Sequence, residues 1–186
     1  MLKSHKNISQ MRTLCEQRNI PIISQNTETF LHKILDKHQP KVCLEIGSAV
    51  GYSTKIIANK ISKRNSKLYS FEVSYPAYLE AIHYIHTLAK PNTTLYPYNF
   101  LKVDIHKIIS PTEKIDFVFI DAQKSQYWNY MMKIRNLLDT SAIIIIDDVI
   151  KYHHKISSLY EFLQQMQIDY QIFQLDADDG VMLIQK

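Results

Sequence analysis

Hydrophobic residues along the chain alternate between helical spacing and short continuous runs. Two helices are expected first, over residues 8–18 and 27–37, because their apolar residues recur at intervals of three and four. The segment NIPIIS between them contains Pro21 and is expected to be a loop. From residue 41 onwards, apolar runs typical of strands alternate with helical segments, which favours an α/β fold.

Seven apolar runs predict the strands of one sheet. The expected strands are 41–46, 67–73, 93–98, 115–121, 142–147, 170–175 and 180–185, and the helices after the first five are 52–60, 76–88, 103–109, 126–138 and 156–167. Because most of the strands are apolar on both sides, we expect a mostly parallel sheet with helices on both faces. The last two strands are joined by DADDG and are expected to form an antiparallel hairpin at the edge.

The composition indicates a globular protein of one domain over residues 1–186. Hydrophobic residues make up 46% of the chain, while the 3 glycines, 6 prolines and net charge of +4 exclude a disordered or fibrous protein. The longest aliphatic run is too short to span a bilayer, so no membrane partner is expected. Cys15 and Cys43 lack the spacing of a zinc site or a disulfide framework, which suits a reducing cytoplasm.

A turn that contains two glycines follows the first expected strand, in the sequence EIGSAVGYS that starts at Glu45. Gly47 and Gly51 would let the backbone approach a ligand, and the next helix would offer free N–H groups. The three glycines of a dinucleotide fingerprint are not present at their fixed offsets. By itself, this segment fits a plain turn between a strand and a helix equally well.

The second expected strand ends in Phe71-Glu72-Val73. A carboxylate at that place can accept hydrogen bonds from both hydroxyls of a ribose, although a single acidic residue there is more often solvated. Together with Glu45, Glu72 predicts an anionic pocket. Such a pocket suits a cationic sulfonium cofactor better than a pyrophosphate.

Three aspartates follow two later strands, Asp121 after the fourth and Asp147 and Asp148 after the fifth. A parallel sheet brings them to one edge, where carboxylates repel each other unless a cation lies between them. Oxygen ligands of this kind favour Mg²⁺ or Ca²⁺ over zinc. Lys124 lies in the turn after Asp121. A turn lysine is usually only solvated, but beside a metal its pKa would fall and it could accept a proton.

These motifs, ExGxxxGYS, FE, FIDAxKxxY and IIDDV in that order, resemble the class I S-adenosylmethionine-dependent O-methyltransferases of the catechol and caffeoyl-CoA type. The segments NIPIIS, LEIGSAVGYST, FVFIDAQKSQYWNY and DGVMLIQ are most similar to small bacterial members, which include the methyltransferase for 5-hydroxyuridine in tRNA. The resemblance extends from about residue 8 to the C-terminus. It implies a Rossmann-like fold whose residues 1–40 cover the cofactor and substrate site.

The resemblance also implies roles for individual residues. The cofactor would be held by Glu45, Gly47, Ser48, Ser53, Glu72, Val73 and Asp121, with Ile23, Asn99 and Phe100 closing around it. Mg²⁺, or another divalent cation such as Mn²⁺ or Ca²⁺, would be bound by Asp121, Asp147 and Asp148, and Lys124 would be the catalytic base beside Asp121. Two positions depart from the pattern. Asp148 replaces the usual Asn, and Tyr98-Asn99 replaces Gly-Asp or Gly-Ala.

The methyl acceptor is left open between two classes, a small catechol-like phenol and a hydroxylated uridine in tRNA. The charge of +4 favours RNA only slightly, because the lysines are spread along the chain. A third interpretation is a non-catalytic protein that binds S-adenosylmethionine. The presence of Lys124 and all three aspartates argues against it, and a homodimer is a further expectation.

Overall fold

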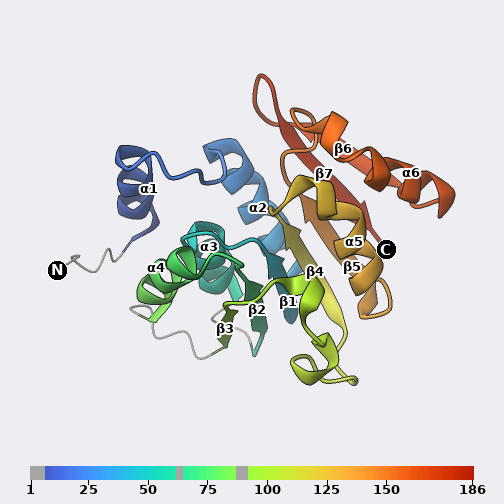
Figure 1. Ribbon diagram of the computed structural model, residues 1–186, viewed down its shortest axis with the longest axis horizontal. Coiled ribbons are helices and arrows are strands. Elements are labelled where there is room, and N and C mark those ends of the chain that lie inside the picture. Colours follow the sequence, from blue (N-terminus) through green and yellow to red (C-terminus); the bar gives the residue numbers. More distant parts are fainter. Residues whose placement is uncertain (1–6, 62–64, 87–91) are drawn as a thin grey trace.

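The computed structural model describes residues 7–61, 65–86 and 92–186 (Figure 1). Its centre is a seven-stranded sheet in the order β3-β2-β1-β4-β5-β7-β6. The strands are β1 (Val42–Ile46), β2 (Lys67–Phe71), β3 (Thr93–Tyr96), β4 (Ile115–Ile120), β5 (Leu138–Ile146), β6 (Tyr170–Gln174) and β7 (Gly180–Gln185). Strands β1 to β5 pair in parallel, and β7 is antiparallel to both β5 and β6. This confirms the predicted, mostly parallel sheet with an antiparallel hairpin at its edge.

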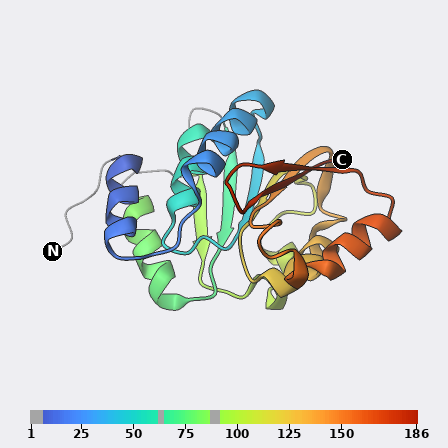
Figure 2. The ribbon, with the colours of Figure 1, turned by 90° about the horizontal axis from the view of Figure 1, so that it is seen from above.

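Helices cover the sheet on its two faces (Figure 2). They are α1 (Ile8–Gln17), α2 (Gln25–His38), α3 (Tyr52–Ile61), α4 (Tyr75–His86), α5 (Tyr127–Ile134) and α6 (Ser157–Gln165). Four short 3₁₀ turns, η1 (Phe100–Lys102), η2 (Ile105–Lys107), η3 (Lys124–Gln126) and η4 (His153–Lys155), complete the described elements. None of the described helices is both long and apolar enough to cross a membrane.

Alternate residues of the central strands contribute to two separate cores. Leu44 and Val118 face the core that includes α5 and α6, whereas Cys43 and Phe117 face the core under α1, α2 and α3. All four side chains are fully buried. Successive side chains of a strand point to opposite faces, so continuous apolar runs were the correct signal for strands buried on both sides.

Three expected elements differ from the structure. Only the short turn η2 lies within the predicted helix over 103–109, where the side chain of Asp104 accepts a hydrogen bond from the backbone N–H of His106. The turn η1 precedes this segment and is capped by Asn99, whose side chain accepts from the N–H of Leu101. Such local bonds compete with a regular helix. The predicted helix over 126–138 ends at Ile134, and β5 starts four residues earlier than expected. The last two residues of the predicted helix over 76–88 lie outside the described residues.

The N-terminal helices α1 and α2 pack against α3. Arg12 of α1 connects them, because its Nη2 donates to Ile23 O at 3.0 Å and to Glu28 Oε2 at 2.9 Å. Its Nε donates to the hydroxyl of Tyr52 at 3.0 Å, and that hydroxyl donates to Glu28 at 2.6 Å. This network fixes the loop of residues 21–24 at the carboxyl edge of the sheet.

Candidate functional site

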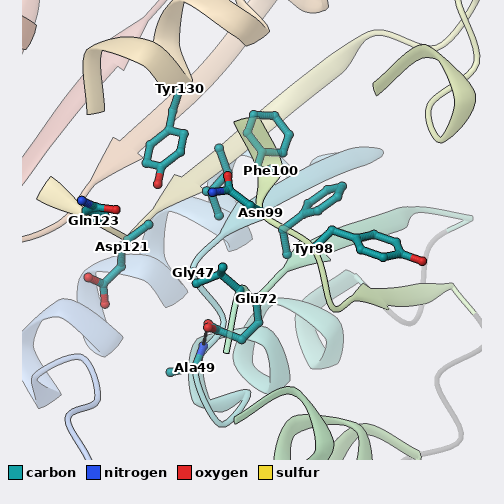
Figure 3. Close-up of a pocket in the computed structure, with 13 residues that line it drawn as sticks. Gly47, Ala49, Glu72, Tyr98, Asn99, Phe100, Asp121, Gln123 and Tyr130 are labelled. Atoms are coloured by element: carbon teal, nitrogen blue, oxygen red, sulfur yellow. Dashed lines mark hydrogen bonds between the residues drawn. The ribbon is translucent and has the colours of Figure 1, made fainter. Parts of the chain in front are cut away.

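Two hollows lie at the carboxyl ends of the parallel strands. The first, called here the strand-end cavity, has a volume of about 280 Å³ (Figure 3). It is lined by Ile46, Gly47, Ala49, Phe71, Glu72, Val73, Tyr98, Asn99, Phe100, Asp121, Ala122, Gln123 and Tyr130. Ligands of open α/β sheets bind at this edge, near the point where the strand order reverses. The sheet reverses its order between β1 and β4, so the cavity lies at that point.

Gly47 brings the turn after β1 against the end of β4. Its φ is +95°, and a Cβ at this position would lie 2.0 Å from the backbone oxygen of Asp121. The missing side chain therefore accommodates the backbone of Asp121, whereas the sequence suggested that it makes space for a ligand. Gly51 has a similar role, because a Cβ there would lie 3.0 Å from the Cβ of Ala81 in α4. Both glycines position the turn, and Gly47 also lines the cavity.

The carboxylate of Glu72 is fixed by two backbone N–H groups. Ala49 N donates to Oε2 at 2.8 Å, and Ser74 N donates to Oε1 at 2.7 Å (Figure 3). Ala49 has a φ of +44°, so the turn after β1 is bent towards the end of β2. Each carboxylate oxygen can accept a further hydrogen bond, and Glu72 therefore presents acceptors to the cavity.

Glu45 in β1, Ser48 in the turn and Ser53 in α3 are buried and do not line the strand-end cavity. Glu45 is fully buried, and its Oε2 accepts hydrogen bonds from Thr54 and Ser70 at 2.6 Å each. Burial raises the pKa of Glu45 more than the hydroxyl groups of Ser53, Ser70 and Thr54 lower it. Glu45 Oε1 and Ser48 Oγ are buried without a hydrogen-bond partner among the described residues. Their expected contact with a cofactor stays a prediction.

The opposite wall of the strand-end cavity contains Asn99 and Phe100, together with residues that the sequence did not mark. Tyr130 comes from α5 and Gln123 from the turn after β4, and both point into the region between Asp121 and Asn99 in Figure 3. Val73 lines the rim and is 70% exposed. Helical spacing marks Tyr130 only as a core residue, so no pattern in the sequence indicated its place in the wall.

The second hollow, called here the acidic cleft, has a volume of about 540 Å³ and shares Ala49 and Asp121 with the strand-end cavity. It is lined by Pro21, Ile22, Ile23, Ser24, Thr27, Ala49, Asp121, Lys124, Asp147, Asp148, Lys151, Tyr152, Asp176, Asp178, Asp179 and Gly180. Six aspartates face two lysines in this lining, so its formal charge is strongly negative. Ile23 lies here with the three aspartates of the expected metal site.

Lys124 lies between two of those aspartates. Its Nζ is 2.8 Å from Asp121 Oδ1 and 2.6 Å from Asp148 Oδ2. Burial alone would lower the pKa of Lys124, but the neighbouring carboxylates, Asp121 first, raise it above its usual value. This differs from the expected lowered pKa. In this arrangement the side chain of Lys124 is a protonated ammonium group that donates hydrogen bonds to the two carboxylates. Lys124 is therefore itself the cation beside them.

Asp147 is the most enclosed carboxylate of the three, with 6% of the residue exposed. Burial raises its pKa well above the usual range, and the charges of Asp121 and Asp148 raise it further. Over residues 7–61, 65–86 and 92–186, no three acidic, His or Cys side chains converge to hold a metal ion. The expected metal site stays a prediction. The donor chemistry fits it, since Lys124 pairs with Asp121 and Asp148 only, and the three carboxylates would gain from another cation.

The hairpin between β6 and β7 supplies three aspartates that the sequence analysis treated only as turn residues. Asp176 accepts a hydrogen bond from Asn26 at 2.8 Å, and Asp178 forms an ion pair with Lys151 at 2.9 Å. Asp179 Oδ1 accepts from the backbone N–H groups of the turn after β5. The acidic run itself was visible in DADDG, but only the antiparallel β5–β7 pairing brings it to the cleft.

The chain matches the O-methyltransferase family over residues 2–186. It belongs to that family. This match confirms the expected enzyme class, an S-adenosylmethionine-dependent O-methyltransferase. The family assignment leaves the methyl acceptor and the metal open.

Solved structures of O-methyltransferases share the fold. An O-methyltransferase of Bacillus cereus in complex with SAH superposes with a TM-score of 0.84 at 19% identity, over 100% of this chain and 93% of that one. The O-methyltransferase TomG of Streptomyces achromogenes, involved in tomaymycin synthesis and in complex with SAM, gives a TM-score of 0.83 at 18% identity, over 100% and 92%. At such low identity, these similarities establish the Rossmann-like methyltransferase fold.

Proposed function

We propose that this O-methyltransferase transfers the methyl group of S-adenosylmethionine to a hydroxyl group of a small catechol-like acceptor, with help from a divalent cation. The main support is the meeting of the strand-end cavity and the acidic cleft at Asp121 and Ala49. A cofactor in the cavity and an acceptor in the cleft would be neighbours at that point. Proximity and orientation of this kind account for a large part of the rate of group transfer.

The strand-end cavity suits S-adenosylmethionine on three grounds. Glu72 presents fixed carboxylate oxygens for ribose hydroxyls, and Asn99 and Phe100 form the wall for the adenine. The partnerless oxygens of Glu45 and Ser48 lie beside the turn, where polar groups of the methionine end would complete their hydrogen bonds. Two known relatives of the same fold are bound to SAM or SAH.

In the proposed reaction, the acceptor oxygen forms a bond to the methyl carbon, the bond from this carbon to sulfur breaks with its electrons going to sulfur, and the hydroxyl proton leaves. When bound, the sulfonium supplies an electrophilic methyl group and the divalent cation lowers the pKa of the acceptor hydroxyl. Asp121, Asp147 and Asp148 would hold the cation. Lys124 can accept the proton only after the carboxylates of Asp121 and Asp148 are occupied by a different cation, because they now hold it protonated.

The acidic cleft favours a small acceptor over tRNA. Phosphate groups of a nucleic acid would be repelled by the six aspartates of its lining, and two lysines do not offset them. The hydrophobic side chains of Pro21, Ile22 and Ile23 offer a surface for an aromatic ring. The non-catalytic alternative is less favoured, because Lys124 and the three aspartates are gathered at the junction of the two hollows.

A methyl-transfer assay with labelled S-adenosylmethionine and Mg²⁺ tests this proposal against both acceptor classes. One series contains catechols and the other contains undermodified bulk tRNA. We expect label in the catechols and none in the tRNA. Label only in tRNA would contradict the small acceptor, and no label in either series would support the non-catalytic alternative.

A further inference from the structure

The last strand of the sheet, β6, lacks the usual protection of a sheet edge. Among the described strands it pairs with β7 alone, and four of its five residues are exposed. Its sequence, YQIFQ, contains no charged residue and no proline, and its register with β7 is continuous, so no bulge bends it away. Natural edges are usually protected by lysine, proline or a bulge, because their N–H and C=O groups can pair with another strand. The edge of β6 is therefore open for pairing.

The backbone groups that face outward at this edge follow from the alternation of an antiparallel ladder. Neighbouring residues of such a strand turn their N–H and C=O groups to opposite sides. Leu175 N donates to Asp179 O at 3.2 Å, directly after β6, so these two residues form a hydrogen-bonded pair. Gln171 and Phe173 therefore also bond to β7. The residues whose backbone groups face away from β7 are Tyr170, Ile172 and Gln174.

The pairing between β5 and β7 agrees with this assignment. Lys186 N donates to Ala142 O at 3.0 Å, so the even-numbered residues of β7 bond to β5. The odd-numbered residues of β7 then bond to β6, where Val181 is the register partner of Phe173. Both ladders thus leave the same residues of β6 facing outward.

Exposed apolar side chains accompany the outward-facing backbone groups. Tyr170 is 39% exposed and Ile172 is 43% exposed, and Met166, in the turn that leads from α6 to β6, is 51% exposed. Tyr170 and Ile172 are two residues apart, so their side chains share one face of the strand. The ring of Tyr170 contacts that of Tyr160 in α6, with centroids 5.8 Å apart, which places this face on the side of α6. Pairing at the edge would shield apolar surface as well as backbone groups.

We propose that two copies of this chain form a dimer in which their β6 strands pair in antiparallel fashion about a two-fold axis at Ile172. Ile172 of one copy exchanges both backbone hydrogen bonds with Ile172 of the second copy, and Tyr170 pairs with Gln174 of the second copy. The two seven-stranded sheets become one continuous sheet. This inference goes beyond the proposed function and depends on neither the methyl acceptor nor the metal.

Symmetry and charge select a second copy as the occupant of this edge. A two-fold interface uses the same surface on both copies, so that surface must be complementary to itself. The outward N–H and C=O groups of β6 meet this condition, because the two-fold axis at Ile172 places each donor opposite an acceptor. The aspartates that flank the strand, Asp169 and Asp176, would face the uncharged Leu175 and Ile168 of the second copy. No two like charges are therefore directly opposed along the pair.

Charge-swapped variants at the two-fold axis test the inference. Sedimentation velocity is measured at about 1 to 100 µM protein for wild type, Ile172→Lys and Ile172→Glu, a range that covers a micromolar dissociation constant. We expect a dimer for wild type. Each variant alone should raise the dimer dissociation constant at least about tenfold, because like charges directly opposite each other destabilise a strand pair. An equal mixture of the two variants should form a heterodimer, because residue 172 of one copy faces residue 172 of the other.

The matched control is Leu79→Lys, which places the same charge on an equally exposed apolar residue. Leu79 lies in α4, which packs against β3 at the other edge of the sheet, so this variant should keep the wild-type dissociation constant. Circular dichroism and thermal unfolding establish that each variant is folded.

Amide hydrogen exchange of the wild type tests the same inference without a substitution. The amide hydrogens of Tyr170, Ile172 and Gln174 should be protected in concentrated protein and should exchange faster on dilution. Those of Gln171 and Phe173 bond to β7 and should be protected at both concentrations.

Four results would overturn the inference. They are a wild type that stays monomeric at about 100 µM, an unchanged dissociation constant in Ile172→Lys, an equal loss of the dimer in Leu79→Lys, and a mixture of the Lys and Glu variants that stays monomeric. Exchange at Ile172 that does not depend on protein concentration would also contradict it.

Discussion

Lys124 Nζ lies 2.6 Å from Asp148 Oδ2. Position 148 is the one at which the family resemblance led us to expect Asn instead of Asp. An Asn would offer Lys124 a neutral oxygen, whereas Asp148 offers a charge. Together with Asp121, this residue raises the pKa of Lys124 and keeps its ammonium in the cleft. The departure from the family pattern therefore connects the proposed base directly to the proposed metal ligands.

Replacing Lys124 by Ala should lower kcat by about 10²- to 10⁴-fold, the usual contribution of a positioned acid or base. Cofactor affinity should change little, because Lys124 lines the acidic cleft and not the strand-end cavity. Higher pH should partly restore the rate, since an acceptor ionised in solution needs no base. Steady-state kinetics across pH check this, with Lys107→Ala as a control at a side chain that is 82% exposed. Wild-type turnover in Lys124→Ala at neutral pH would disprove the role.

Replacing Glu72 by Ala should weaken the binding of S-adenosylmethionine by about 1.5–3 kcal/mol, because charged acceptors of hydrogen bonds are lost. The variant also releases Ala49 N and Ser74 N from the carboxylate, so the turn after β1 loses its connection to β2. Titration calorimetry measures the change. Glu161→Ala, at an exposed position of α6, serves as the control. An unchanged dissociation constant in Glu72→Ala would remove Glu72 from the cofactor site.

Glu45 should make the stability of the fold depend on pH. Its pKa is raised by burial, so its contribution to stability is complete below the pKa of the unfolded chain and is lost as pH rises through the folded pKa. Glu45→Gln keeps an acceptor for Thr54 and Ser70 without a charge. As pH rises from 5 to 8, the urea midpoint of the wild type should decrease by more than that of the variant. If the urea midpoints of wild type and Glu45→Gln changed equally with pH, Glu45 would not be the source of the pH dependence.

Arg12 should stabilise the N-terminal helices through its partly buried hydrogen-bond network. Arg12→Ala leaves Glu28 and the carbonyl of Ile23 without this donor, which should cost about 1–3 kcal/mol of unfolding free energy. The KM for cofactor or acceptor should also rise, because Ile23 lines the cleft. The unfolding free energy is measured in urea and compared with that of Arg18→Ala. This control breaks an exposed ion pair with Glu80 and should cost less stability. Equal losses in both variants would contradict this account.

The sequence predicted the order of strands and helices because its apolar runs are buried on both faces of the sheet, as Leu44 and Cys43 illustrate. It failed where local hydrogen bonds decide the structure. Within the expected helix over 103–109, the cap formed by Asp104 leaves only one short turn, and the cap formed by Asn99 starts another short turn just before it. These bonds depend on individual side chains and leave no periodic signal.

The strand-end residues of the candidate site could also be predicted, since the carboxyl ends of parallel strands meet at one edge. Glu72 and Asp121 lie at this edge as expected. Tyr130 and Asp179 could not be assigned to it, because their places depend on how α5 and the final hairpin pack. The expected homodimer and cytoplasmic location stay predictions from the sequence.

The central claim is cation-assisted methyl transfer in the acidic cleft, and one measurement tests it most directly. The initial rate of methyl transfer from labelled S-adenosylmethionine to 4-propylcatechol is followed with Mg²⁺, after addition of EDTA, and after Mg²⁺ or Mn²⁺ is restored in excess. Because Asp121, Asp147 and Asp148 are hard oxygen ligands with too little positive charge beside them, the rate should fall to background in EDTA and return with either metal. A full rate in EDTA would contradict the account.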